Sequence, residues 1–254
     1  MTPELAALLN MLLPEAQIAF AVFLRVGAMM ALAPAFGETV IPARVRLAVT
    51  LAFTLIVTSA LPPAPSPTFG LPEVAAEVVA GLTLGIGLRL LVIALQVAGT
   101  IAAQSTSLAQ FFGGAGVDPQ PAMSQLLVMA GLALAVMLGL HVQLVELLLL
   151  SYDLFPVGAL PDAAQLAEWG IAQTARAFAL AFSLAMPFVL ISVVYFIALG
   201  VINKAMPQLM VALVGAPAIT FAGLALLMVC APLMLPIWHN SLTAFLNHPD
   251  GLLP

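Results

Sequence analysis

Six long apolar segments dominate this chain, and each is long enough to cross a lipid bilayer. A membrane-spanning helix needs about 20 mainly apolar residues. The segments that reach this length lie at about 16–36, 41–61, 78–103, 123–151, 171–200 and 208–236. Because each is too long and too continuous for a barrel strand, we expect helices. The predicted fold class is an all-α integral membrane protein with about six long, kinked hydrophobic helices in hairpins, forming a single domain over residues 1–254.

Few charged residues are available to cover a water-soluble surface. Charged residues make up 7% of the chain and hydrophobic residues 63%, whereas a soluble domain is about a quarter charged. The 6 bases are scattered among 11 acids, which argues against nucleic acid as a partner. Cys230 is the single cysteine and cannot form an intrachain disulfide. No base precedes Arg25, so we expect no cleavable signal peptide and a retained first segment.

The charges between the apolar segments predict an orientation. The connection after the first segment carries Arg44 and Arg46, and the connection after the fifth carries Lys204. The connections at 62–77 and 152–170 carry acids and no base. Since basic loops prefer the cytoplasm, we expect both termini and the acidic loops to lie on the opposite side of the membrane.

The last long apolar stretch is interrupted around Lys204, Pro207 and Gln208, and further prolines stand at Pro187 and Pro217. Cationic and helix-breaking residues are costly at membrane depth, so they usually mark a transport pathway or an assembly surface. Interrupted helices of this kind also occur in secondary transporters, which leaves that class of protein as an alternative. The two halves of the chain, however, show no matched pair of interruptions.

Two arginines fall inside apolar segments, and two more lie at a proline corner. Arg25 is midway through the first segment and Arg89 is inside the third. An arginine facing lipid at the bilayer centre costs about 3 kcal/mol or more, so each should face protein or water. They either line a conduit or contact a subunit, or they are structural residues that bond carbonyls or an acid. A plain helical hairpin explains Pro42 at the corner but does not explain Arg44 and Arg46.

The third segment carries glycines at Gly81, Gly85, Gly87 and Gly99. Glycines four residues apart allow another helix to approach closely. We therefore expect this segment to pack tightly against a neighbouring helix.

The connection between the third and fourth segments is rich in glycine and aromatic residues: Phe111, Phe112, Gly113, Gly114 and Gly116. It lacks the Lys-Ser/Thr ending and the preceding strand of a phosphate loop. Two interpretations remain. The connection is either a flexible interfacial loop or a movable plug whose aromatic pair fills a constriction.

The sequence shows no set of residues for catalysis or metal binding. His141 and Glu146 are five residues apart, which places them about 140° apart around a helix and is poor geometry for a shared metal. No serine or cysteine can be matched with a nearby histidine base. We expect no catalytic residue, no cofactor and no metal site.

A series of short motifs follows in a definite order along the chain. They read Arg25-Val26-Gly27, Pro34-Ala35-Phe36-Gly37, Ile41-Pro42-Ala43-Arg44-Val45-Arg46, Asp118-Pro119, Gly139-Leu140-His141, Ser151-Tyr152-Asp153-Leu154-Phe155-Pro156-Val157-Gly158, Ala185-Met186-Pro187, Leu199-Gly200, Lys204, Pro207-Gln208 and Gly215-Ala216-Pro217. In this order and spacing they resemble the FliR family, the flagellar biosynthetic subunit of the type III export gate, with injectisome relatives of the SctT type.

The resemblance implies a multi-pass protein of the bacterial inner membrane at the flagellar basal body. It implies assembly with FliP-like, FliQ-like and FlhB-like subunits into a helical gate, surrounded by lipid, that passes unfolded flagellar proteins. It also implies that about Ser105–Gln120 acts as the pore plug. Candidates for assembly or for lining the pore are Arg25, Arg44, Arg46, Arg89, Lys204, Pro207 and Gln208. The equivalent injectisome subunit is a further alternative.

Two positions depart from the family pattern. The family usually carries an asparagine shortly after Pro207-Gln208, where this chain has Leu209-Met210. The family usually carries an arginine where this chain has Lys204. Lysine keeps the charge but lacks the planar fork of donors, which puts a bidentate contact there in doubt.

Overall fold

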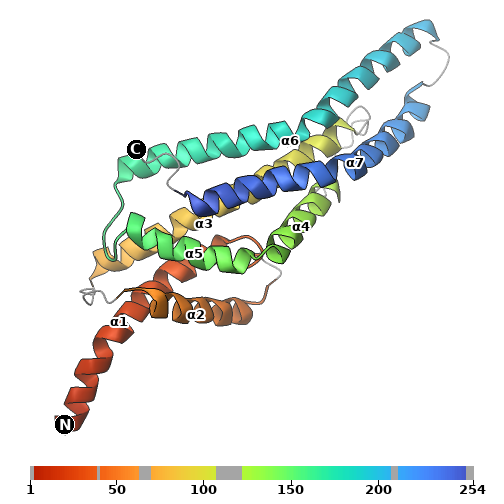
Figure 1. Cartoon of the computed structure of the whole chain (residues 1–254). Coiled ribbons are helices and arrows are strands. Elements are labelled where there is room, and N and C mark those ends of the chain that lie inside the picture. The colour runs from red at the N-terminus through yellow and green to blue at the C-terminus, as the bar shows by residue number, and fades with distance from the viewer. Residues whose placement is uncertain (1–2, 39–40, 63–69, 107–121, 207–210, 250–254) are drawn as a thin grey trace. The chain divides into compact units, whose positions relative to one another are not determined.

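The computed structural model describes residues 3–38, 41–62, 70–106, 122–206 and 211–249, which form seven α-helices (Figure 1). The helices are α1 Pro3–Leu32, α2 Ala43–Ala60, α3 Leu71–Ser105, α4 Ala122–Met137, α5 Leu140–Leu154, α6 Ala163–Ala205 and α7 Val211–Asn247. The described residues contain no β-strand. The predicted all-α fold class is confirmed.

The predicted helix at 123–151 is wrong, because the structure divides it into α4 and α5. The break lies at Leu138 and Gly139, and the two helices meet at a bend of 75°. Gly139 has a φ of +88°, a left-handed conformation that glycine adopts without the penalty a Cβ would impose. Its N–H donates to the carbonyl of Val136 at 3.1 Å, and its carbonyl accepts from the N–H of Val142 at 2.9 Å. One glycine thus ends α4 and starts α5.

Other helices extend beyond the apolar windows seen in the sequence. α1 begins at Pro3, α3 begins at Leu71, and α6 begins at Ala163. The added residues at the start of each helix are of mixed polarity. A search for apolar segments long enough to cross a bilayer therefore leaves them out of the predicted helices. The prolines predicted to interrupt helices are accommodated inside them, at Pro187 in α6 and Pro217 in α7.

The helices are apolar enough for a multi-pass membrane protein. Five of them contain a window of suitable length and hydropathy, within α1, α2, α3, α6 and α7. The bent pair α4 and α5 would count as a sixth span if it crosses as one broken segment. Among the described residues, many large apolar side chains on α2, α6 and α7 are exposed, as expected for surfaces that meet lipid or another subunit.

The chain contains two compact units, and the first comprises residues 1–90, 136–173 and 242–254. Within it, α1 packs against α3 through the predicted glycine face. A Cβ at Gly81 would clash with the backbone carbonyl of Arg25, and a Cβ at Gly85 would come within 3.0 Å of the Cβ of Leu32. The predicted close packing at these glycines is confirmed.

The second unit comprises residues 91–135 and 174–241. Its centre is Trp238, which is fully buried and donates from Nε1 to the carbonyl of Leu91 at 2.8 Å. The indole packs over Gly131, where a Cβ would meet the ring at 3.4 Å. On α6, the Tyr195 hydroxyl donates to the carbonyl of Gly215 on α7 at 2.7 Å. These contacts connect α3, α4, α6 and α7.

The close approach of α1 to α3 predicts that Gly81→Ala destabilises the protein. The added methyl would force α1 away from α3, and overpacking of this kind typically costs about 1–3 kcal/mol. The measurement is the midpoint of thermal unfolding of the purified protein in detergent, which should fall. Gly200→Ala on α6 is the matched control, since a Cβ there meets nothing within 4 Å. An equal effect of the two substitutions would contradict the packing role of Gly81.

Candidate functional site

A buried ion pair joins α1 to α3 in the first unit. Arg25 donates from Nε to Oε2 of Glu77 at 2.8 Å and from Nη2 to Oε1 at 3.2 Å. This is the bidentate arrangement in which a guanidinium binds a carboxylate most strongly. The two side chains are only 1% and 2% exposed. A charged pair buried so completely is stable only if its remaining polar atoms are also bonded.

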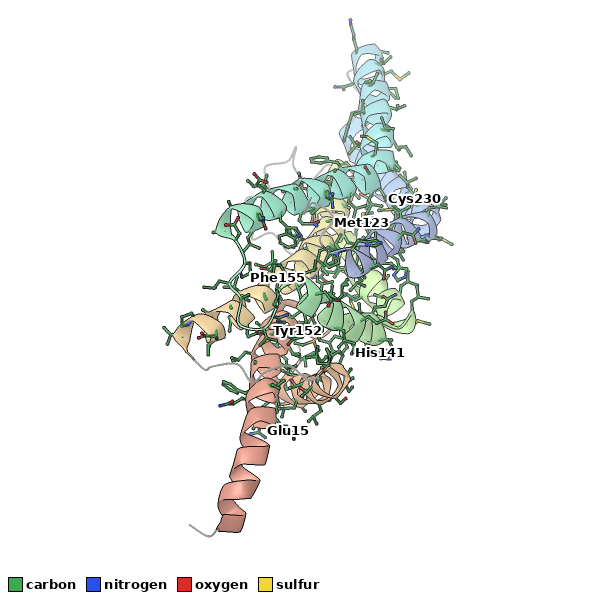
Figure 2. All side chains as sticks on the ribbon, turned by 60° about the vertical axis from the view of Figure 1, so that its left-hand side comes forward. Glu15, Met123, His141, Tyr152, Phe155 and Cys230 are labelled. Carbon is green, nitrogen blue, oxygen red and sulfur yellow. The ribbon has the colours of Figure 1, made fainter. Side chains whose placement is uncertain are left out.

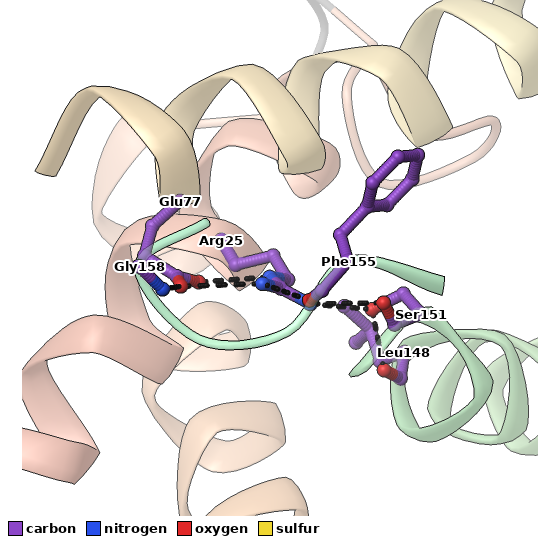
Figure 3. A network of polar contacts seen from close by, with 6 residues as sticks. All are labelled: Arg25, Glu77, Leu148, Ser151, Phe155 and Gly158. Carbon is purple, nitrogen blue, oxygen red and sulfur yellow. Dashed lines mark hydrogen bonds and ion pairs between the residues drawn. The ribbon is translucent and has the colours of Figure 1, made fainter. Parts of the chain in front are cut away.

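The remaining donors of Arg25 bind the end of α5 (Figure 3). Nη1 donates to the carbonyl of Ser151 at 3.1 Å and to its Oγ at 3.2 Å, and Nη2 donates to the carbonyl of Phe155 at 2.8 Å. A guanidinium has five N–H groups, and the five contacts to Glu77, Ser151 and Phe155 match that number. The cost of burying the cation is therefore offset by a complete set of acceptors.

The same cluster fixes the connection between α5 and α6. Oε1 of Glu77 accepts a hydrogen bond from the backbone N–H of Gly158 at 2.9 Å, and Gly158 has a φ of +75°. The Oγ of Ser151 donates to the carbonyl of Leu148 at 2.6 Å. The Tyr152 ring lies under the guanidinium, with Cζ of Arg25 3.8 Å from the ring centroid, a favourable cation–π contact. We call Arg25, Glu77, Ser151, Tyr152, Phe155 and Gly158 the arginine cluster.

A second, more exposed ion pair fixes the corner between α1 and α2. Nη1 of Arg89 lies 2.7 Å from Oε1 of Glu38, with side-chain exposures of 36% and 29%. Nη2 of Arg46 donates to the backbone carbonyl of Glu38 at 3.0 Å. Two of the predicted site arginines therefore contact Glu38 within the chain.

The other predicted site residues are not brought together within the described part of the chain. Arg44 is exposed in the first turn of α2, and Lys204 is exposed in the last turn of α6. His141 and Glu146 are exposed on α5, and Figure 2 shows Tyr152 and Phe155 at the opposite end of this helix from His141. The plug residues Phe111, Phe112, Gly113, Gly114 and Gly116, together with Pro207 and Gln208, lie outside the described residues.

The acids that pair with the arginines, Glu77 and Glu38, are absent from the predicted site residues. The prediction that Glu77 lies in a loop at 62–77 is wrong, because α3 already begins at Leu71. A signal was present: Glu77, Gly81 and Gly85 follow one another at intervals of four residues, so they share one helix face. Because the two glycines pack on α1, Glu77, which lies one turn before them on the same face of α3, also faces α1 and can bind Arg25.

Among the described residues, no group of three or more potential metal ligands occurs. A pocket of about 210 Å³ in the first unit is lined mainly by apolar residues of α3, α6 and the α5–α6 connection. Trp169 in its wall donates from Nε1 to the carbonyl of Pro249 at 2.9 Å. In the first unit, the ion pairs Arg25–Glu77 and Arg89–Glu38 each join α3 to α1 or to the segment that follows it.

The completeness of the arginine cluster predicts a strong effect of breaking it on one side. Arg25→Met leaves Glu77 buried without its cation, and such a change typically costs about 3–5 kcal/mol. We expect lower yield of folded protein and a lower unfolding midpoint in detergent. Glu77→Gln should act in the same direction.

The matched control is the double substitution Arg25→Met with Glu77→Leu, which removes both charges. It should recover part of the lost stability, because no uncompensated charge remains in the core. If the loss of stability in the double variant, relative to the wild type, equalled the sum of the losses in Arg25→Met alone and Glu77→Leu alone, the two side chains would not be coupled as the structure shows.

Comparison with known proteins agrees with the motifs and the helical architecture. The family described as bacterial export proteins, family 1, matches residues 16–245. The flagellar biosynthetic protein FliR of Caulobacter vibrioides is 35% identical over 236 residues, which cover 89% of this chain and 93% of the relative. FliR of Escherichia coli is 26% identical, with 88% of each chain covered, and FliR of Pectobacterium carotovorum is 28% identical, with 84% of each chain covered. The chain therefore belongs to the FliR family of bacterial export proteins, whose members are membrane subunits of the flagellar type III export gate.

Proposed function

We propose that this chain is a non-enzymatic framework subunit of the gate in the bacterial inner membrane, at the flagellar basal body. In this proposal it assembles with FliP-like, FliQ-like and FlhB-like subunits and forms part of the channel for unfolded flagellar proteins. The single observation that carries the proposal is the length of exposed apolar surface on α6.

That surface is longer than the hydrocarbon core is thick. Exposed apolar side chains extend along α6 from Ile171 to Val201, about 45 Å along the helix axis at 1.5 Å per residue. The hydrocarbon core is about 30 Å thick. A straight helix would need a tilt of about 48° to place the whole surface in hydrocarbon, beyond the usual range of up to 40°. α6 contains Pro187, where a helix can bend, and we propose that protein subunits cover part of this surface beside lipid.

Burial within the chain supports the same conclusion. Only 17% of the most apolar 18-residue window of α6 is buried by the rest of the chain, although this window is the most apolar among the candidate spans. Exposed residues also cover α7, including Phe221 at 75% and Met228 at 82%. Methionine side chains are deformable, which suits a surface that must repack when subunits move against one another.

The test of the proposed function is affinity purification of the tagged chain from detergent-solubilised membranes of its own host. FliP-like and FliQ-like subunits should co-purify in one assembly, and a strain without the gene should fail to build flagella. A solitary, monodisperse species recovered from membranes that also contain the partner subunits would contradict the proposal.

We propose further that the segment at about 105–120 is the plug of the channel. Its two ends are attached to the same unit: Thr106 lies against Gly223 of α7, where a Cβ would meet it at 2.7 Å, and Ser124 lies against Gly99 of α3, where a Cβ would meet its Cα at 2.5 Å. Fixed ends suit a loop that closes a constriction and returns to the same place.

Deleting residues 111–116 should make the resting gate leak. The deletion removes the aromatic pair and the glycines next to it, so ions and small solutes should pass through assembled gates that hold no substrate. The measurement is the conductance of cells or of reconstituted gates, with replacement of the same six residues by Gly-Ser repeats as the control for loop length. Unchanged permeability in a gate shown to be assembled would count against the plug.

A further inference from the structure

The first turn of α2 carries two positive charges where a helix normally favours negative ones. Arg44 and Arg46 stand there, and no acid accompanies them. Because the helix N-terminus is itself positive, each arginine is electrostatically unfavourable in this position. Within residues 33–60, Glu38 is the only acid, and its carboxylate is already paired with Arg89. The excess charge therefore needs a role beyond the stability of the helix.

The two arginines point to opposite sides of α2. Two residues along a helix correspond to about 200° around its axis. Arg46 is half-buried and shares a face with Thr50, Phe53 and Thr54, which are buried. Its Nη2 bonds the carbonyl of Glu38. Arg46 is thus used inside the protein, and Arg44 is the arginine that remains outside.

Arg44 stands at the head of an exposed apolar stripe. Leu47, Leu51 and Leu55 follow it at intervals of three and four residues, so all four lie on one helix face. The leucines are 51%, 48% and 70% exposed. Among the residues that the structure describes, none forms a hydrogen bond or ion pair with the Arg44 side chain. The stripe presents one cation followed by a purely apolar surface.

The dimensions of the stripe match one leaflet of a bilayer. From Arg44 to Leu55 the rise is about 16 Å at 1.5 Å per residue, and one leaflet contributes about 15 Å of the hydrocarbon core. The whole of α2, with 18 residues, is about 27 Å long and can cross the core once. Leucines at acyl-chain depth would then place Arg44 at the level of the lipid headgroups.

We propose that Arg44 and the Leu47–Leu51–Leu55 stripe form a binding site for an anionic phospholipid. The guanidinium would bind the phosphate, since its fork of donors matches phosphate oxygens, and in an anionic phospholipid no cationic headgroup cancels the charge of that phosphate. One acyl chain would lie along the three leucines. A zwitterionic lipid presents the same chains but no net charge, so it would bind more weakly. The proposal depends on membrane insertion and is independent of the export role.

The first test is native mass spectrometry of the purified assembly after addition of phosphatidylglycerol or phosphatidylcholine. The wild type should retain phosphatidylglycerol in preference to phosphatidylcholine. Arg44→Gln should reduce the retained phosphatidylglycerol about fivefold and leave the unfolding midpoint near that of the wild type. Arg44→Lys, which keeps the charge, should retain most of the lipid.

Arg46→Gln is the matched control, because it removes the same charge two residues away. It should lower the unfolding midpoint by loosening the corner at Glu38 and leave the preference for phosphatidylglycerol in place. Equal loss of lipid in Arg44→Gln and Arg46→Gln would show a diffuse charge effect and overturn the site. Equal retention of the two lipids by the wild type would also overturn it.

A second test distinguishes lipid from a protein occupant. A photo-crosslinking amino acid at Leu51, in the assembled gate in native membranes, should give lipid adducts. Adducts to another subunit in most of the crosslinked protein would show that the stripe is a protein interface and would overturn the proposal. This outcome would leave the proposed export function intact.

Discussion

The buried pair of Arg25 and Glu77 determines how the first unit is arranged. A guanidinium and a carboxylate cannot be removed from water at low cost unless every donor and most acceptor positions are filled. Here the donors reach three backbone or side-chain partners on α5 and its following connection, and the carboxylate also holds Gly158. Because no single helix could supply these partners, the pair requires α1, α3 and α5 to meet at one point.

The small residues of α3 are a condition for that meeting. Arg25 reaches Glu77 only if the two backbones are close, and the absence of a side chain at Gly81 allows the carbonyl of Arg25 itself to lie where a Cβ would be. In a membrane protein, helix association depends on such packing and on interhelical hydrogen bonds, since lipid tails are as apolar as the side chains. The glycine face and the ion pair are therefore two parts of one interface.

Much of the fold could be predicted from the sequence, and the reasons for the failures are physical. Long apolar segments specify membrane helices because the backbone must satisfy its own hydrogen bonds in lipid. Hydropathy does not reveal the helix break at Gly139. One continuous apolar helix and two apolar helices joined at a glycine have the same hydropathy profile. Hydropathy also assigned Glu77 to a loop, because an acid lowers the hydropathy of its window. The partner that makes Glu77 acceptable in a helix lies 52 residues away.

The arginines show most clearly what sequence alone can and cannot assign. Each was a candidate for assembly or for the pore, and they occupy three different environments: complete burial for Arg25, partial burial beside Glu38 for Arg46 and Arg89, and exposure for Arg44. Burial is decided by which face of a helix a residue occupies and by what packs on that face. The spacing of Arg44 and Arg46 already implies opposite faces, but only the buried Phe53 and Thr54 show which face is inside. The environment of a charged residue in an apolar helix can thus be assigned once the burial of its neighbours on the same helix face is known.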